Sequence, residues 1–174
     1  MSRITVLRLG HRAHRDHRIS THCCLVARAL GADGIIYTGQ KDSEMEKTVE
    51  KIAKQWGGSF TVNHAKTYKE VVKEWKAKKG YIVHLTMYGL PFHNHMNKIK
   101  KEDLLVIVGG EKVPGEVYQL ADLNLAVTNQ PHSEIAALGL FLDKYFSGKE
   151  LDKNFSKAKL KIVPQERGKK IIKH

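Results

Sequence analysis

Cysteine, proline and long apolar runs are scarce in this sequence of 174 residues. Its two cysteines, Cys23 and Cys24, are adjacent and so form neither a disulfide framework nor a metal knuckle, which predicts a reducing, cytoplasmic setting. The longest apolar runs, such as residues 104–108, have the length of a strand and are too short to cross a membrane. Residues 1–4 begin no apolar segment of the kind found in signal peptides. We therefore expect neither a secreted nor a membrane protein.

Several enzyme signatures are also missing. The sequence has no G-x-G-x-x-G, no P-loop and no G-x-S-x-G, which disfavours a dinucleotide-binding dehydrogenase, an ordinary nucleotide triphosphatase and a serine hydrolase. His93 and His95 flank Asn94, but no cysteine or acidic partner stands at ligand spacing. We therefore predict surface histidines there and no metal site.

Acidic residues are few compared with basic ones. The chain has 30 Lys and Arg against 18 Asp and Glu, a net charge of +12. This excess favours a polyanionic partner, and nucleic acid is the first candidate. A basic, thermophile-like surface that only solvates the protein would give the same composition. Composition alone leaves both interpretations open.

The arginines are concentrated near the amino terminus, whereas the lysines are spread along the chain. Six of seven arginines lie in the first thirty residues, and Arg12, Arg15 and Arg18 are spaced three apart among histidines. Arginine grips phosphate through a planar pair of donors, whereas lysine acts as a point charge. This segment therefore predicts a phosphate contact, with a solvated loop as the alternative. Residues 149–174 add a net charge of +6, either as a packed extension that contacts phosphate or as a frayed tail.

Strand-like apolar runs alternate with helical patterns along most of the chain, which is typical of a parallel α/β sheet with helices on both faces. In such sheets ligands bind beyond the carboxyl ends of the strands. We predict one domain over residues 1–147 and a basic C-terminal extension over residues 148–174. The predicted strands are residues 4–9, 35–38, 59–63, 81–85, 104–108 and 123–128; the predicted helices are residues 21–30, 43–56, 67–78 and 133–146, with Thr21 capping the first and capping boxes opening the second and third.

Three loops that follow strands have an unusual content. Residues 109–116 contain paired glycines, residues 129–134 are strongly polar, and residues 86–91 combine glycine and proline. Such loops bring backbone donors and acceptors close to a ligand and would suit an adenine and a ribose. Ordinary turns between strands and helices are the alternative reading.

The sequence resembles the archaeal tRNA cytidine 2'-O-methyltransferase family of the SPOUT superfamily. The resemblance extends from Arg3 to the segment 164–168 and is carried by long motifs: Arg8-Leu9-Gly10-His11-Arg12, Arg15-Asp16, Thr21-His22, Gly110-Glu111-Lys112-Val113-Pro114 and Asn129-Gln130-Pro131-His132-Ser133-Glu134. It implies methylation of the ribose of cytidine 56 in the T loop, with S-adenosylmethionine as methyl donor. It also implies a trefoil knot in the C-terminal half and a homodimer with the active site near the subunit interface.

The resemblance also implies roles for individual residues. Arg28 matches the catalytic arginine of related ribose methyltransferases, and His22 stands where they more often have Asn. Arg28 would position the 2'-hydroxyl and polarise it or accept its proton. Ser133 matches the third motif, but Ile135 occupies its Asn position. The implied cofactor residues are Leu85, Gly109, Gly110, Glu111, Lys112, Val113, Val127, Thr128, Asn129, Gln130, Pro131, His132, Ser133 and Glu134, and the implied RNA contacts are Arg12, Arg15, Arg18 and His22.

Two other functions fit the same sequence. A non-catalytic RNA-binding protein would use the basic surface alone and would not bind S-adenosylmethionine. A base methyltransferase of the SPOUT class would place the methyl group on a nucleobase instead of a ribose. Calorimetry with the cofactor tests the first, and digestion of modified tRNA tests the second.

Overall fold

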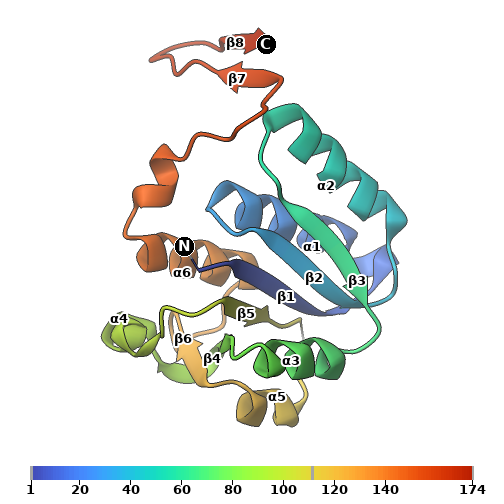
Figure 1. Cartoon of the computed structure of the whole chain (residues 1–174), viewed down its shortest axis with the longest axis vertical. Helices are drawn as coiled ribbons and strands as arrows, with labels where there is room; N and C mark the ends of the chain where they lie inside the picture. Colours follow the sequence, from blue (N-terminus) through green and yellow to red (C-terminus); the bar gives the residue numbers. More distant parts are fainter. Residues whose placement is uncertain (1, 111, 174) are drawn as a thin grey trace.

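The computed structural model, which describes residues 2–110 and 112–173, contains a six-stranded parallel sheet (Figure 1). Its order is β3-β2-β1-β5-β4-β6, and every neighbouring pair in it is parallel. This confirms the fold class predicted from the alternating pattern. The strands are β1 (Ile4–His11), β2 (Gly34–Gly39), β3 (Thr61–Ala65), β4 (Tyr81–Pro91), β5 (Leu104–Val108) and β6 (Leu123–Ala126).

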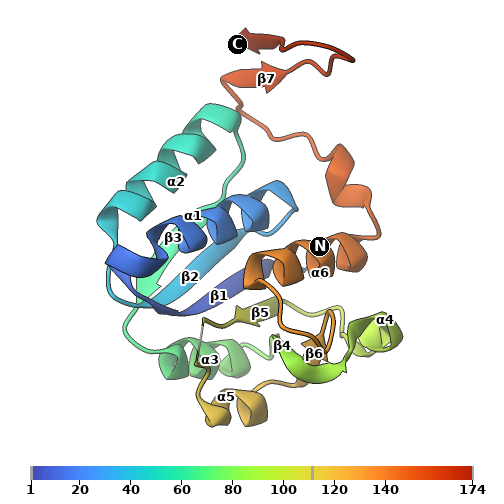
Figure 2. The ribbon, with the colours of Figure 1, turned by 180° about the vertical axis from the view of Figure 1, so that it is seen from behind.

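Helices cover both faces of this sheet (Figures 1 and 2). One apolar cluster joins the sheet to α1 (Ala13–Ala29), α2 (Ser43–Trp56) and α6 (Glu134–Phe146). A second cluster, on the other face, includes residues of α3 (Tyr68–Ala77) and α5 (Gly115–Leu120). All five residues of β5 are fully buried, as their unbroken Leu, Ile and Val sequence predicts for a strand covered on both sides. No helix of the described chain is long and apolar enough to span a bilayer.

The structure confirms most of the predicted helix starts. Thr67 caps α3, because its hydroxyl accepts a hydrogen bond from the Glu70 amide at 3.3 Å. Ser133 caps α6. At α2 the cap is Asp42, whose carboxylate accepts from the Met45 amide at 2.9 Å, so the helix is capped one residue earlier than the predicted capping box implies.

The first helix begins eight residues before the predicted cap. Thr21 lies within α1, and its hydroxyl donates to the His17 carbonyl at 2.7 Å instead of capping a helix. The true start is stabilised from elsewhere in the chain: the Ala13 amide donates to the Gln40 side chain at 2.8 Å. The predicted arginine segment therefore lies at the start of a helix and not on a loop.

The C-terminal extension is packed near its start and projects further on. After α6 the chain forms a 3-10 helix, η2 (Lys149–Asp152), and the antiparallel strands β7 (Leu160–Ile162) and β8 (Ile171–Lys173), which form a separate sheet (Figure 1). Glu150 is buried, and Phe155 packs against Gly58. Between β4 and β5 lie two further short elements, α4 (Phe92–His95) and the 3-10 helix η1 (Met96–Lys98).

Candidate cofactor and RNA site

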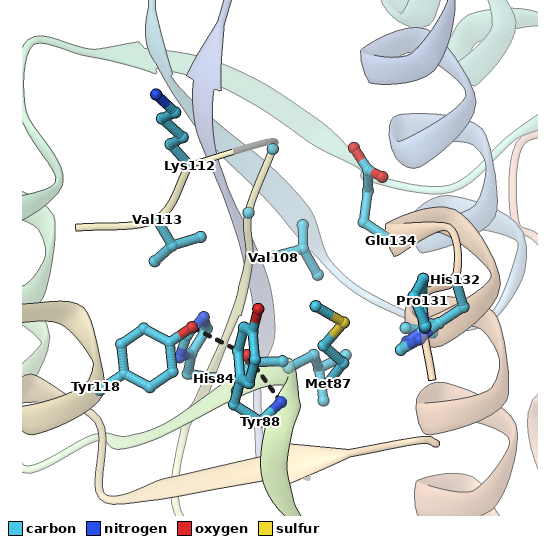
Figure 3. Close-up of a pocket in the computed structure, with 15 residues that line it drawn as sticks. His84, Met87, Tyr88, Val108, Lys112, Val113, Tyr118, Pro131, His132 and Glu134 are labelled. Atoms are coloured by element: carbon cyan, nitrogen blue, oxygen red, sulfur yellow. Dashed lines mark hydrogen bonds between the residues drawn. The ribbon is translucent and has the colours of Figure 1, made fainter. Parts of the chain in front are cut away.

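A cleft of about 570 Å³ lies at the carboxyl ends of β4 and β5, where a parallel sheet is expected to bind its ligand (Figure 3). Loops from separate parts of the sequence meet here, as their content predicted. The predicted cofactor residues that line the cleft are Leu85, Gly109, Gly110, Lys112, Val113, Pro131, His132 and Glu134.

Other predicted cofactor residues are near the cleft but do not line it. Asn129 instead donates its side-chain amide to the Met87 carbonyl at 2.7 Å and to the Gly89 carbonyl at 3.1 Å, and so ties the loop after β6 to β4. Ser133 is used as the cap of α6. Val127, Thr128 and Gln130 are likewise absent from the lining of this cleft, and Glu111 lies outside the described residues.

Sequence reasoning missed the part of β4 that continues past Leu85. Beyond this point the register with β6 shifts, and Thr86, Met87 and Tyr88 line the cleft. The Thr86 hydroxyl lies 3.1 Å from the Tyr118 hydroxyl of α5, which closes one wall (Figure 3). Residues 86–88 belong to a segment that the sequence had singled out as a ligand loop, and the structure makes them part of β4. The lining residues that sequence reasoning missed are His84, Val108, Tyr118 and Ala137.

Two glycines after β5 form a close backbone turn at the base of the cleft. A Cβ added to Gly109 would lie 2.1 Å from Cγ2 of Val113, and one added to Gly110 would lie 3.1 Å from Nη1 of Arg8. The first contact is impossible without movement, because real Cβ atoms do not approach so closely. A side chain at Gly109 would therefore force Val113 or the loop to move, whereas one at Gly110 would ask only a small shift of Arg8.

A buried arginine lies beneath this loop. Arg8 of β1 is 1% exposed, and its guanidinium donates to the Leu9 carbonyl and pairs with the Glu134 carboxylate at 3.2 Å. Its Nε atom has no hydrogen-bond partner in the described structure. The Glu134 side chain is 25% exposed and faces the cleft, so Arg8 fixes a carboxylate at its edge. An arginine between the apolar residues Leu7 and Leu9 of a strand was the sequence signal for this role.

A smaller cleft of about 340 Å³ adjoins the first one and shares Gly110 and Lys112 with it. Arg12 lines this second cleft, and its guanidinium pairs with Asp16 through contacts of 3.0 and 3.3 Å. The hydrogen bond from Arg12 lowers the pKa of Asp16, although burial opposes this effect. The predicted RNA contacts Arg15, Arg18 and His22 are exposed on α1.

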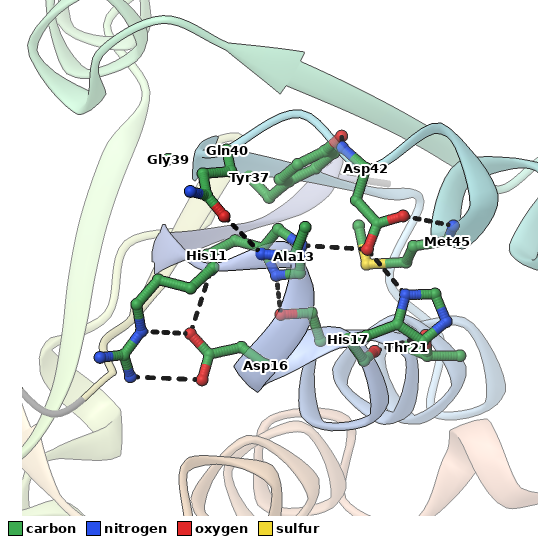
Figure 4. Close-up of polar contacts among 12 residues, drawn as sticks. His11, Ala13, Asp16, His17, Thr21, Tyr37, Gly39, Gln40, Asp42 and Met45 are labelled. Carbon is green, nitrogen blue, oxygen red and sulfur yellow. Dashed lines mark hydrogen bonds and ion pairs between the residues drawn. The ribbon is translucent and has the colours of Figure 1, made fainter.

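A buried polar network fixes the start of α1 against the start of α2 (Figure 4). The His11 ring joins the Ser20 hydroxyl at 2.8 Å to the Asp42 carboxylate at 3.2 Å, and His17 contacts the same carboxylate at 2.7 Å. Burial lowers the pKa of His11 despite its carboxylate neighbour. Burial acts to raise the pKa of Asp42, but hydrogen bonds from the Met45 amide and the two histidines prevail and lower it.

This network predicts that acid destabilises the fold. The pKa of His11 is lower in the folded chain than the ordinary value of about 6.5, so the unfolded chain takes up a proton first and the free energy of unfolding falls as pH drops below that value. Replacing His11 by glutamine should make the free energy of unfolding depend less on pH between pH 7.5 and 5.5. The slope should decrease by up to about 1.4 kcal/mol per pH unit. Urea unfolding at several pH values measures it. The exposed His93→Gln change is the control, and an equal effect of both changes would refute the role of His11.

Arg28 lies at the opposite end of the sheet from the cleft. Its Nη2 donates to the Gly57 carbonyl at 2.6 Å, and its guanidinium carbon lies 4.5 Å from the ring centroid of Phe155. These partners belong to the loop after α2 and to the C-terminal extension. Arg28 is buried in these contacts. They give Arg28 a structural role within the chain, and its catalytic role stays a prediction.

Replacing Arg28 by methionine separates a structural role of this residue from a catalytic one. The change removes the hydrogen bond to Gly57 and the cation–π contact with Phe155, so we expect a lower melting temperature and faster proteolysis of residues 148–173. Cofactor affinity and the turnover of the remaining folded enzyme should stay within about twofold of the wild type. Isothermal calorimetry and limited proteolysis measure both effects. Loss of turnover in a fully folded variant would support the predicted catalytic role instead.

The cleft fits a nucleoside that carries an amino acid group. Val108, Val113 and Ala137 provide apolar walls, and the glycine turn exposes backbone donors and acceptors. Lys112 and Glu134 supply charges of both signs for a charged tail. Its volume is within the range of small-molecule sites. No group of three metal-ligating side chains occurs among residues 2–110 and 112–173.

Solved structures of RNA methyltransferases share this architecture. The structure titled TrmH/SpoU tRNA modifying enzyme from A. aeolicus superposes with a TM-score of 0.62 at 14% identity, over 86% of this chain and 77% of that one. The SpoU methyltransferase AviRb from Streptomyces viridochromogenes, solved in complex with AdoMet, superposes with a TM-score of 0.59 at 16% identity, over 85% of this chain and 59% of that one. The chain thus has the SPOUT methyltransferase fold.

Sequence comparison then gives the family. A protein of Thermococcus kodakarensis named tRNA (cytidine(56)-2'-O)-methyltransferase is 53% identical over 174 residues, which cover 97% of this chain and 96% of that protein. The family model described as tRNA ribose 2'-O-methyltransferase, aTrm56, matches residues 56–172. The chain belongs to this family.

Proposed function

We propose that this protein methylates the ribose 2'-hydroxyl of cytidine 56 in tRNA, with S-adenosylmethionine as methyl donor. The observation that carries this proposal is the glycine-lined cleft at the carboxyl ends of β4 and β5, in a chain 53% identical to a protein named for that reaction. The alternative, a non-catalytic RNA-binding protein, would not need such a cleft.

The cleft residues bind and orient the cofactor. Bound S-adenosylmethionine supplies an activated methyl group on a sulfonium, so the protein mainly provides position and removes one proton. Val108 and Val113 would hold the apolar part of the cofactor, and the backbone of Gly109 and Gly110 would offer it hydrogen-bonding groups. Glu134, fixed by Arg8, would offer a carboxylate to its positive charge.

His132 is the proposed proton acceptor in place of Arg28. Its Nδ1 lies 2.6 Å from the Gln130 carbonyl, which can only accept, so Nδ1 carries the ring proton and Nε2 keeps a lone pair. Nε2 would then accept the proton that the ribose hydroxyl loses when it takes up the methyl group that S-adenosylmethionine would supply. His132 lines the cleft and is solvent-exposed, so the proton can then leave to water.

Arg12, Arg15, Arg18 and His22 bind the RNA. Arg12 borders the smaller cleft beside Gly110, and a phosphate held there would bring its nucleotide next to the cofactor. Arg15 and Arg18 continue the basic surface along α1. Such contacts position the RNA without reading its sequence, and the 2'-hydroxyl itself distinguishes RNA from DNA.

The proposal includes three finer statements. The enzyme is a homodimer, which is supported by the exposed apolar side chains of Ile19 on α1 and Leu140 on α6, two helices that pack together. The chain forms a trefoil knot, a proposal supported by the hydrogen bonds from Asn129 to the β4 carbonyls of Met87 and Gly89. The enzyme acts in the cytoplasm, where its tRNA substrate would be.

Incubation with an unmodified tRNA transcript and cofactor carrying a labelled methyl group tests the proposal. We expect label in one nucleotide, and nuclease digestion followed by mass spectrometry should place it on the ribose of cytidine 56. Label on a base would favour the base methyltransferase alternative. Absence of both transfer and cofactor binding in calorimetry would favour the non-catalytic RNA-binding protein.

A further inference from the structure

A second basic surface lies on α2 and the C-terminal extension. The helix exposes Lys47, Lys51 and Lys54, whose spacing of four and three places them on one side of the helix. Lys159 of the extension lines a groove of about 480 Å³ together with these three lysines. The only carboxylate among the described residues of this groove is Glu50.

A neighbouring groove of about 760 Å³ continues this surface along the extension. Lys153, Lys157 and Lys161 line it, and the described lining contains no carboxylate. It also holds the half-buried ring of Trp56 and the exposed side chain of Ile162. Gln55 lines the first groove, and Trp56, the next residue at the end of α2, lines the second. Together the two linings hold seven lysines and one glutamate, and we call them the α2–extension surface.

The packing of the extension on α2 fixes the shape of this surface. The Lys159 amide donates to the Gln55 carbonyl at 3.0 Å, and the Gly58 amide donates to the Ser156 carbonyl at 2.9 Å. Gly57 has a positive φ of 82°, and an added Cβ would lie 2.6 Å from the Ser156 carbonyl oxygen. Backbone contacts therefore hold the lysines of the two segments in a defined arrangement, unlike those of a frayed tail.

The composition of the α2–extension surface fits the backbone of RNA. Seven lysines with a single carboxylate repel one another, and a polyanion would offset this repulsion. The indole of Trp56 can contact a sugar or stack on a base. The 14 residues of α2 extend over about 21 Å, enough to follow several phosphates.

The extension end of this surface lies far from the cleft of the same chain. The 17-residue helix α1 runs from the smaller cleft, lined by Arg12, to Arg28, which contacts Phe155 of the extension. The helix is about 25 Å long. We propose that the α2–extension surface is a second RNA-binding site, which holds a part of the tRNA remote from the methylated nucleotide. This proposal rests on the proposed function, in which tRNA is the substrate.

Neutralising the lysines of α2 tests this second site. We expect the triple variant Lys47→Gln, Lys51→Gln, Lys54→Gln to bind tRNA at least tenfold more weakly at 0.15 M salt. The slope of log affinity against log salt should become smaller by about two, because three phosphate contacts are lost. The KM for tRNA should rise, whereas kcat at saturating tRNA and cofactor affinity should not change. Filter binding, methyl-transfer kinetics and calorimetry measure these quantities.

The matched control removes three lysines from the other face of the sheet. Lys73, Lys76 and Lys78, on and just after α3, are exposed, and their replacement by glutamine gives the same change in net charge. This control should bind tRNA within about twofold of the wild type. Equal losses in both variants would mean that only overall charge matters and would overturn the second site, as would wild-type affinity in the α2 variant. An inactive wild-type enzyme would instead refute the proposed methylation.

Discussion

Replacing Arg8 by methionine is expected to destabilise the protein and weaken cofactor binding together. The guanidinium is 1% exposed, and its removal leaves the Leu9 carbonyl and the Glu134 carboxylate without their shared donor. Losing one member of a buried pair costs several kcal/mol; since Glu134 is partly exposed, we expect the free energy of unfolding to fall by about 2 to 3 kcal/mol. Cofactor affinity should fall at least tenfold, because Glu134 would no longer be held in place.

A double-mutant cycle separates these two causes. If Arg8 acts through Glu134, adding Glu134→Gln to Arg8→Met should cost about 1 to 2 kcal/mol less than the sum of the single changes. Urea unfolding and calorimetry with the cofactor measure the two free energies. Arg3→Met, at an exposed residue just before β1, serves as control and should change neither. Fully additive effects would show that Arg8 and Glu134 act independently.

Replacing Gly109 by alanine is expected to abolish most cofactor binding in a protein that still folds. The new methyl group would lie 2.1 Å from Cγ2 of Val113, so the turn must move away from the position that faces the cleft. We expect cofactor affinity to fall at least tenfold and methyl transfer to fall with it. Far-UV circular dichroism should stay close to that of the wild type.

Shortening the opposing side chain should reverse this effect. Val113→Ala removes the atom that the new methyl group meets, so the double variant Gly109→Ala, Val113→Ala should recover most of the lost affinity. Val113→Ala alone is the matched control for the lost apolar contact. Calorimetry on all four proteins gives the comparison. Wild-type affinity in Gly109→Ala would show that the close turn is not needed for binding.

The sequence predicted most of the scaffold because its signals are local. The unbroken apolar run 104–108 predicts a strand that is buried on both faces, and β5 has these bounds in the structure. The caps at Thr67 and Ser133 satisfy amides only two or three residues away, so they too can be read from sequence. The loops around Gly109 and His132 were found for the same reason, since loop composition follows local backbone needs.

The start of α1 and the choice of arginine depended on contacts between distant residues. The helix begins at Ala13 because Gln40 satisfies its first amide, a contact across 27 positions that no local pattern contains. Arg8 and Arg28 are both buried arginines close to glycines in the sequence, yet of these two only Arg8 lies under the cleft.

By itself, then, the sequence determined the parallel α/β class, the glycine turn and the family that these motifs resemble. The tertiary structure decided which residues meet. Because β5 lies between β1 and β4, Arg8 reaches Glu134 at the carboxyl ends of the strands, whereas the length of α1 carries Arg28 to the other end of the sheet. Strand order is a property of the whole chain, and for that reason the spacing of a motif could not show which arginine lies beneath the cleft.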